Sequence, residues 1–230
     1  MTVQEILQTL QQHSNFVNIQ GMSRYGINTE KAFGIKIPIL RQLAKSIGKN
    51  HPLALELWKS EFHEARLLAI FIADPKQVDE TLMEQWVLDF NSWDICDQCC
   101  SNLFERTPFA FQKALEWVDR NEEFVKRAGF VLIAVLAVHR KKLNDQEFLP
   151  FFSCIEEKSD DERNFVKKAV NWALRQLGKR SSLLRDRAIE VCERLKVRDS
   201  KSARWIATDA LRELKSEKKQ KKIVKLADTK

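Results

Sequence analysis

Glycine, proline and tyrosine are scarce in this chain of 230 residues, which contains 6 glycines, 5 prolines and one tyrosine. Glycine and proline supply most tight turns, and runs that alternate between apolar and polar residues are also few, so the composition argues against a sheet-rich fold. A glycine-rich phosphate loop is missing as well, which excludes nucleotide binding by such a loop. We therefore expect helices throughout.

Long hydrophobic runs are missing too. A helix that spans a bilayer needs about 20 apolar residues, and the longest run in this chain, 128–138, is much shorter. That run predicts a buried helix. Because the sequence shows neither a membrane segment nor a secretory leader, we expect a cytoplasmic protein whose five cysteines remain free thiols.

A zinc site is the alternative role for some of these thiols. Cys96 and Cys99 have the Cys-x-x-Cys spacing of a zinc ligand pair. The sequence offers no second pair, since Cys154 and Cys192 are isolated, and the four histidines are scattered. On a helix the clustered thiols would fall on the apolar side, where cysteine acts as a small hydrophobe. We expect no metal and no cofactor.

Charge is distributed unevenly along the chain. Residues 1–119 contain 11 lysines and arginines against 15 acidic residues, whereas residues 120–230 contain 28 against 17. A basic half indicates a polyanionic partner, most commonly nucleic acid, although a merely solvated basic surface would look the same. With 44% hydrophobic residues, the chain can form one large domain or two small ones.

Apolar residues recur with helical periodicity in successive blocks, and short breaks such as Asp74-Pro75 and Thr107-Pro108 separate them. Short loops without intervening strands predict an all-α fold of stacked helical pairs, a curved α-α superhelix, with a plain helical bundle as the alternative. We expect one domain over 1–215 and a basic, flexible tail over 216–230. The predicted helices are 2–13, 37–47, 52–59, 62–73, 77–89, 92–104, 108–119, 122–139, 145–157, 161–177, 181–195 and 200–215.

The helix that starts near residue 92 carries an aromatic ring and a carboxylate on one side. Trp93 and Asp97 are four residues apart, so about 40° separates them around a helix. Ile95, Cys96 and Cys99 fall on the other side and form an adequate apolar face. A tryptophan beside an aspartate on the polar face therefore indicates a functional site.

Two later helices place a tryptophan on a polar face. In 161–177, Trp172 lies opposite the apolar residues and is flanked by Lys168 and Arg175; Trp205 repeats this arrangement 33 residues later. A ring bracketed by cations suits contact with a sugar or base beside a phosphate. The alternative is a tryptophan at the rim of the core that packs against a neighbouring helix.

Arg127 and Tyr25 are further candidates. Arg127 opens a mostly apolar helix, so it either meets a carboxylate or lines a groove and holds an anion. Tyr25 lies between predicted helices beside Arg24, and core packing explains it as well as function does.

Taken together, these residues resemble the DNA alkylation repair family of HEAT-like-repeat DNA glycosylases, over nearly the whole chain from Met22 to about Leu214. One departure is Ser92, since some members carry an aromatic residue at this point before the tryptophan. The segments that carry the resemblance are Trp93-Asp94-Ile95-Cys96-Asp97, which looks like the family's W-D-x-x-D motif, Phe165–Arg175, Lys126-Arg127-Ala128 and Met22-Ser23-Arg24-Tyr25.

The resemblance implies a HEAT-like-repeat superhelix that holds duplex DNA and releases alkylated purines such as 3-methyladenine and 7-methylguanine as a monomer. It implies that Asp97 is the catalytic carboxylate and that Trp93 and Trp172 are the aromatic pair around the lesion sugar. The implied DNA contacts are Tyr25, Arg127, Lys168 and Arg175. The alternatives are a helical-repeat scaffold without chemistry that binds nucleic acid or an acidic protein, and a role on structured RNA.

Overall fold

The computed structural model describes residues 1–216, and every regular element in that range is a helix. This confirms the predicted all-α fold class. Contacts divide the chain into two compact units, Met1–Phe109 and Ala110–Lys230, which we call the amino-terminal and carboxy-terminal units. The predicted tail lies outside the described residues except for Ser216.

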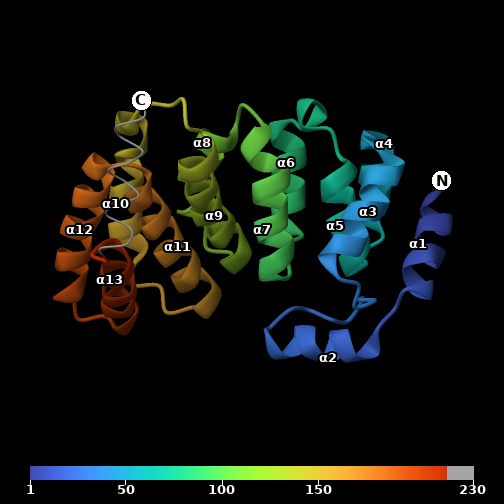
Figure 1. Cartoon of the computed structure of the whole chain (residues 1–230), viewed down its shortest axis with the longest axis horizontal. Helices are drawn as coiled ribbons and strands as arrows, with labels where there is room; N and C mark the ends of the chain where they lie inside the picture. The colour runs from blue at the N-terminus through green and yellow to red at the C-terminus, as the bar shows by residue number, and fades with distance from the viewer. Residues whose placement is uncertain (217–230) are drawn as a thin grey trace. The chain divides into compact units, whose positions relative to one another are not determined.

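The two units contain successive helices joined by short connections (Figure 1). The elements of the amino-terminal unit are α1 (Val3–Gln12), α2 (Phe16–Arg24), α3 (Ile37–Ile47), α4 (His51–Lys59), α5 (His63–Ile72), η1 (Pro75–Gln77), α6 (Glu80–Leu88), α7 (Trp93–Asn102) and η2 (Phe104–Arg106). Those of the carboxy-terminal unit are α8 (Ala110–Trp117), α9 (Glu123–His139), η3 (Asp145–Phe148), α10 (Pro150–Lys158), α11 (Asn164–Arg180), α12 (Ser182–Lys196) and α13 (Lys201–Leu214).

Helix α2 is absent from the sequence-based prediction, which leaves 14–36 without a helix. None of its residues is buried, and Phe16 and Val17 are 70% and 74% exposed. Apolar periodicity reveals a helix by the face that it buries, so a helix without a buried face gives no such signal. Tyr25 still lies between helices, as expected, because it is the C-cap residue that follows α2.

Helix α5 is the centre of the amino-terminal unit. It contacts α1, α3, α4 and α7, and all of its residues except Phe71 are buried. Neighbours therefore surround it, and its buried side chains include the polar groups of His63, Glu64 and Arg66. The arrangement fixes α3 and α7 on the same central helix.

A buried carboxyl group ties α5 to the segment before α3. Glu64 is fully buried, and its two oxygens accept hydrogen bonds from the backbone N–H groups of Phe33, Gly34 and Ile35, at 2.7 to 3.1 Å. Gly34 has a φ of +76°, and a Cβ there would lie 2.3 Å from the carbonyl oxygen of Asn15. Only glycine fits this close approach of α2 to the segment.

Helix α9 has the corresponding position in the carboxy-terminal unit. It packs against α8 and α11. The run 128–138, predicted to be buried, is buried over 128–137, whereas Val138 is 40% exposed. A Cβ on Gly129 would lie 2.7 Å from the backbone nitrogen of Val118, so glycine permits the close packing of α9 against the end of α8. Within residues 1–216, no helix is both long and apolar enough to cross a membrane.

Helices α11 and α13 have the predicted faces and contact each other. Each carries a complete apolar stripe toward the core and a charged face away from it, which is the pattern of stacked helical repeats. The predicted inward residues are all buried: Val166, Val170, Ala173, Leu174 and Leu177 in α11, and Ala203, Ile206, Ala207, Ala210 and Leu214 in α13.

Candidate nucleic-acid interface

Helix α7 presents Trp93 and Asp97 on its more exposed side. Both are partly exposed, whereas Ile95, Cys96 and Cys99 on the opposite side are at most 1% exposed. The predicted division of this helix into a buried face and a polar face is therefore confirmed. The ring and the carboxylate are neighbours on one face because four residues make slightly more than one turn.

Trp93 also contacts the end of α2. Its indole Nε1–H donates a hydrogen bond to the backbone carbonyl of Tyr25, with 3.1 Å between nitrogen and oxygen. Tyr25 is itself 74% exposed, so packing in the core does not explain why a tyrosine occupies this position. The structure thus brings together three of the predicted site residues, Tyr25, Trp93 and Asp97, within the amino-terminal unit.

Ser92, the departure from the family pattern, has a structural role. The residue is fully buried, and its hydroxyl oxygen accepts a hydrogen bond of 2.9 Å from the backbone N–H of Asn28. Its side chain makes no capping bond to α7, although Ser92 occupies the N-cap position. The serine instead ties the segment after α2 to the start of α7, close to Trp93.

Asp94, the first aspartate of the motif, is paired with His63, a histidine to which the sequence assigns no role. His63 Nε2 lies 2.9 Å from Asp94 Oδ2, and both side chains are largely buried. The other polar atoms of the pair, Nδ1 of His63 and Oδ1 of Asp94, have no hydrogen-bond partner within residues 1–216. Asp94 therefore joins α7 to α5, and Asp97 is the motif carboxylate on the side of Trp93. His63 and Asp94 are 31 residues apart, which is close to the period of a helical repeat. This spacing is the one feature of the sequence that could have indicated the pair.

Arg127 is 6% exposed near the start of α9. Its Nη1 donates a hydrogen bond of 2.6 Å to the backbone carbonyl of Phe165 at the start of α11. The guanidinium thus links the amino-terminal ends of two neighbouring helices of the carboxy-terminal unit. Burial leaves only a small part of this side chain for contact with an anion.

The other predicted cations of this unit, on α11, differ in their surroundings. Lys168 is exposed, and Trp172 one turn later is half-buried. Arg175 Nη1 lies 3.4 Å from Asp209 and 3.2 Å from Glu213, both on α13. Lys168 is therefore better placed than Arg175 to contact a phosphate, because the charge of Arg175 is already neutralised.

Trp205 is 40% exposed, as expected for its polar face. The cation above its ring is Lys167 of α11, with Nζ 5.2 Å from the ring centroid. On α13 itself, helical spacing places Lys201, Asp209 and Arg212 on the same side as Trp205. Contact between α11 and α13 thus decides which charge meets the ring.

The clustered thiols of α7 lie in the core. Cys96, Cys99 and Cys100 are fully buried, and burial is the first cause that raises the pKa of Cys99 and Cys100 well above the ordinary value. A metal ligand must be the thiolate, which this environment disfavours. Among the described residues, no group of three or more histidine, cysteine or carboxylate side chains is arranged to hold a metal ion.

Comparisons with known proteins agree with this all-helical architecture. The model of the family described as DNA alkylation repair enzyme matches residues 6–214. An uncharacterized protein of Listeria innocua is 23% identical over 164 residues, which are 70% of this chain and 71% of that protein. A solved structure aligns over 92% of this chain and 95% of its own with a TM-score of 0.77 and 20% identity. It represents a family related to the HEAT-like repeat DNA glycosylases, with affinity for branched DNA structures. The fold is thus a HEAT-like helical-repeat fold, as predicted.

Proposed function

Because this chain belongs to the DNA alkylation repair enzyme family, we propose that it hydrolyses the N-glycosidic bond of cationic alkylated purines in duplex DNA. Substrates of this kind are 3-methyladenine and 7-methylguanine. One observation carries the proposal: α7 holds the ring of Trp93 and the carboxylate of Asp97 as partly exposed neighbours on one face.

The substrate makes a single carboxylate sufficient. A purine alkylated at N3 or N7 carries a positive charge, so the electron pair of the breaking bond neutralises the base as it leaves. No general acid has to protonate the leaving group, in contrast to the two carboxylates of most glycoside hydrolases. Water adds to C1′ of the deoxyribose and loses its proton to the carboxylate or to solvent.

Asp97 and the aromatic rings have distinct roles in this reaction. Positive charge develops at C1′ as the bond breaks, and an ionised Asp97 stabilises that charge and orients the attacking water. The faces of Trp93 and Trp172 pack on the sugar, where their π electrons favour an adjacent positive charge. The Trp93–Tyr25 hydrogen bond supports this role because it restrains the indole ring.

The proposed contacts to the DNA backbone are sequence-independent. Lys168 is exposed and can meet a phosphate directly, while the exposed ring of Tyr25 can lie along the backbone. Arg127 and Arg175 keep their proposed role in holding the backbone. For Arg175 this requires that phosphate replaces or shares the contacts with Asp209 and Glu213.

Release of free base tests the proposal directly. Duplex DNA with one 7-methylguanine is incubated with excess protein, without heating, and the free base is quantified by mass spectrometry against a protein-free control. We expect release well above the spontaneous rate, with an abasic site left in the strand. If base is released no faster than in the protein-free control, even when the protein saturates the duplex, the proposal is overturned.

Lys168→Gln tests the backbone contact. We expect the variant to bind undamaged duplex severalfold more weakly and to lower the slope of log affinity against log salt by about one, as for loss of one phosphate contact. Fluorescence anisotropy across a salt series measures both. Lys196→Gln on α12 removes the same charge from another exposed position of this unit. Equal effects of the two variants would show a general charge effect and contradict a contact by Lys168.

A second candidate function is binding of branched DNA without base release. The related protein of known structure has affinity for branched DNA structures. In addition, Arg175, which the glycosylase proposal assigns to a phosphate, already forms ion pairs with Asp209 and Glu213. A four-way junction in the same binding assay separates the candidates. This second function is favoured if the protein binds the four-way junction tightly and releases base no faster than the protein-free control.

A further inference from the structure

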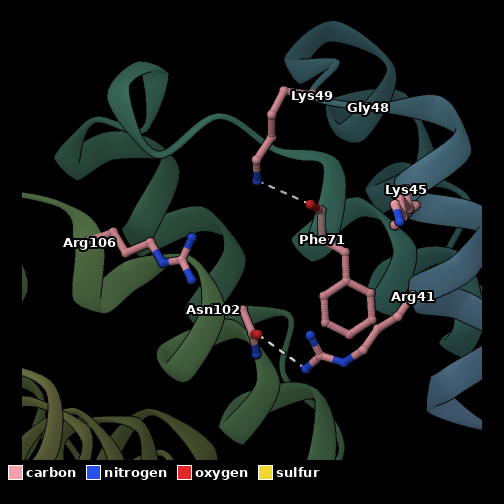
Figure 2. A pocket seen from close by; sticks show the side chains of 8 residues that line it. Arg41, Lys45, Gly48, Lys49, Phe71, Asn102 and Arg106 are labelled. Atoms are coloured by element: carbon pink, nitrogen blue, oxygen red, sulfur yellow. Dashed lines mark hydrogen bonds between the residues drawn. The ribbon is translucent and has the colours of Figure 1, made fainter.

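A second polar site lies in the amino-terminal unit, away from Trp93 and Asp97. It is a pocket of about 290 Å³ between α3, the end of α5, α7 and η2. Figure 2 shows the side chains of Arg41, Lys49 and Arg106 extending toward its open space from three different segments. Its lining includes Arg41, Lys45, Lys49, Phe71, Asn102 and Arg106. We call this site the cationic pocket.

The cationic pocket gathers positive charge in a half of the chain that is acidic overall. Four of its lining residues are lysines or arginines and none is acidic. The nearby acidic residue that acts on one of them is Asp74, whose charge raises the pKa of Lys49 without outweighing burial and Arg106, which lower it. Like charges gathered around a hollow repel one another, so the arrangement favours a bound anion.

Neutral groups hold Arg41 in place without neutralising it. Its Nη2 donates hydrogen bonds of 3.2 Å to the side-chain oxygens of Gln98 and Asn102 on α7. The guanidinium also lies over the ring of Phe71, 4.5 Å from the ring centroid. Because α7 and α5 both restrain it, Arg41 is pre-organised and keeps its full charge at the pocket.

Lys49 is restrained in the same way from the opposite side. Its Nζ donates hydrogen bonds to the backbone carbonyls of Phe71 at 3.1 Å and Ala73 at 2.7 Å. Burial lowers the pKa of Lys49, the charge of Arg106 lowers it further, and the charge of Asp74 opposes the shift. The cost of holding Lys49 and Arg106 together would fall if an anion entered between them.

We propose that the cationic pocket binds a phosphate group of a nucleic-acid strand. Phosphate offers several acceptor oxygens around a compact charge, which suits donors that converge from three sides. Asn102, which lines the pocket, and Gln98, which bonds to Arg41, lie roughly 140° and 100° around α7 from Asp97. The pocket therefore holds a different phosphate from those beside the reacting sugar, either within a strand or at a 5′ end. This proposal requires nucleic-acid binding but not base release.

The double substitution Lys45→Gln/Arg106→Gln tests the cationic pocket. Neither side chain makes a hydrogen bond or ion pair with another described residue, so the fold should be retained. Arg41 and Lys49 are left intact because they contact the surrounding helices. The matched control is Lys59→Gln/Lys76→Gln, which removes two exposed charges of the same unit outside the pocket.

The first probe is inorganic phosphate, added at constant ionic strength while amide signals are followed by NMR. We expect the Gly48 and Lys49 amides to shift in the wild type and in the control, and the shifts to be lost in the double variant. The second probe is undamaged duplex DNA, for which we expect threefold to tenfold weaker binding by the double variant and a salt slope lower by about one.

Two versions of the duplex, with 5′-phosphate or 5′-hydroxyl ends, identify the source of the phosphate. A loss of affinity confined to the phosphorylated duplex assigns the pocket to a strand end, and an equal loss on both assigns it to an internal phosphodiester. Either result supports the proposal. Equal losses in the control, or unchanged DNA binding by the double variant, would overturn it. Base release is not measured, so failure here leaves the proposed glycosylase reaction untouched.

Discussion

Replacement of Asp97 by asparagine is expected to slow release of 7-methylguanine by at least about 100-fold, the range found when a preorganised electrostatic contact to a transition state is lost. Asparagine keeps nearly the same size and removes the negative charge. The sugar then loses the group that stabilises charge at C1′ and orients water. DNA affinity should stay the same or increase, because a negative charge near the phosphates is removed.

Single-turnover rates at saturating protein measure this effect separately from binding. The control is Glu56→Gln on α4, which removes an exposed negative charge of the same unit away from α7. We expect this control to release base at the wild-type rate. Excision by Asp97→Asn within a factor of about three of the wild type would eliminate the carboxylate mechanism, because loss of the charge should cost far more.

Replacement of Glu64 by alanine is expected to destabilise the protein by about 3 kcal/mol or more. The buried carboxyl group accepts hydrogen bonds from three consecutive backbone N–H groups. Each buried donor left without an acceptor costs about 1–3 kcal/mol, and removal of the side chain adds a cavity. The loss should fall on the segment before α3 and on its contact with α2, which carries Tyr25.

Urea unfolding followed by circular dichroism measures this loss, with Glu56→Ala as the control at an exposed position. We expect a clearly lower midpoint for Glu64→Ala and almost no change for the control. Glu64→Gln should fall between wild type and Glu64→Ala, since the amide keeps one acceptor oxygen. If Glu64→Ala and Glu56→Ala have the same midpoint, the buried carboxyl group does not hold the segment.

Local periodicity accounts for the parts of the molecule that the sequence predicts well. Twelve of the thirteen α-helices among residues 1–216 overlap predicted helices, because each of those twelve buries at least one apolar residue. The α7 face with Trp93 and Asp97 follows from their spacing alone. Helix α2 is not predicted because it buries no residue and therefore shows no apolar periodicity.

Contacts between distant segments account for what the sequence does not predict. The bond between His63 and Asp94 depends on the packing of α5 against α7. The ion pairs of Arg175 depend on Asp209 and Glu213 of α13, which lie more than thirty residues further along the chain. Side-chain spacing within one helix carries no information about which charge the neighbouring helix supplies.

The sequence by itself determined the helical class, the family and the shared face of Trp93 and Asp97, because each depends on residues close together in the chain. Only the tertiary structure decided that Trp93 bonds to the end of α2 and that Arg175 is already ion-paired. It also created the cationic pocket, since Arg41 of α3 and Arg106 of η2 line one pocket only because α3 and α7, which contacts η2, both pack on α5.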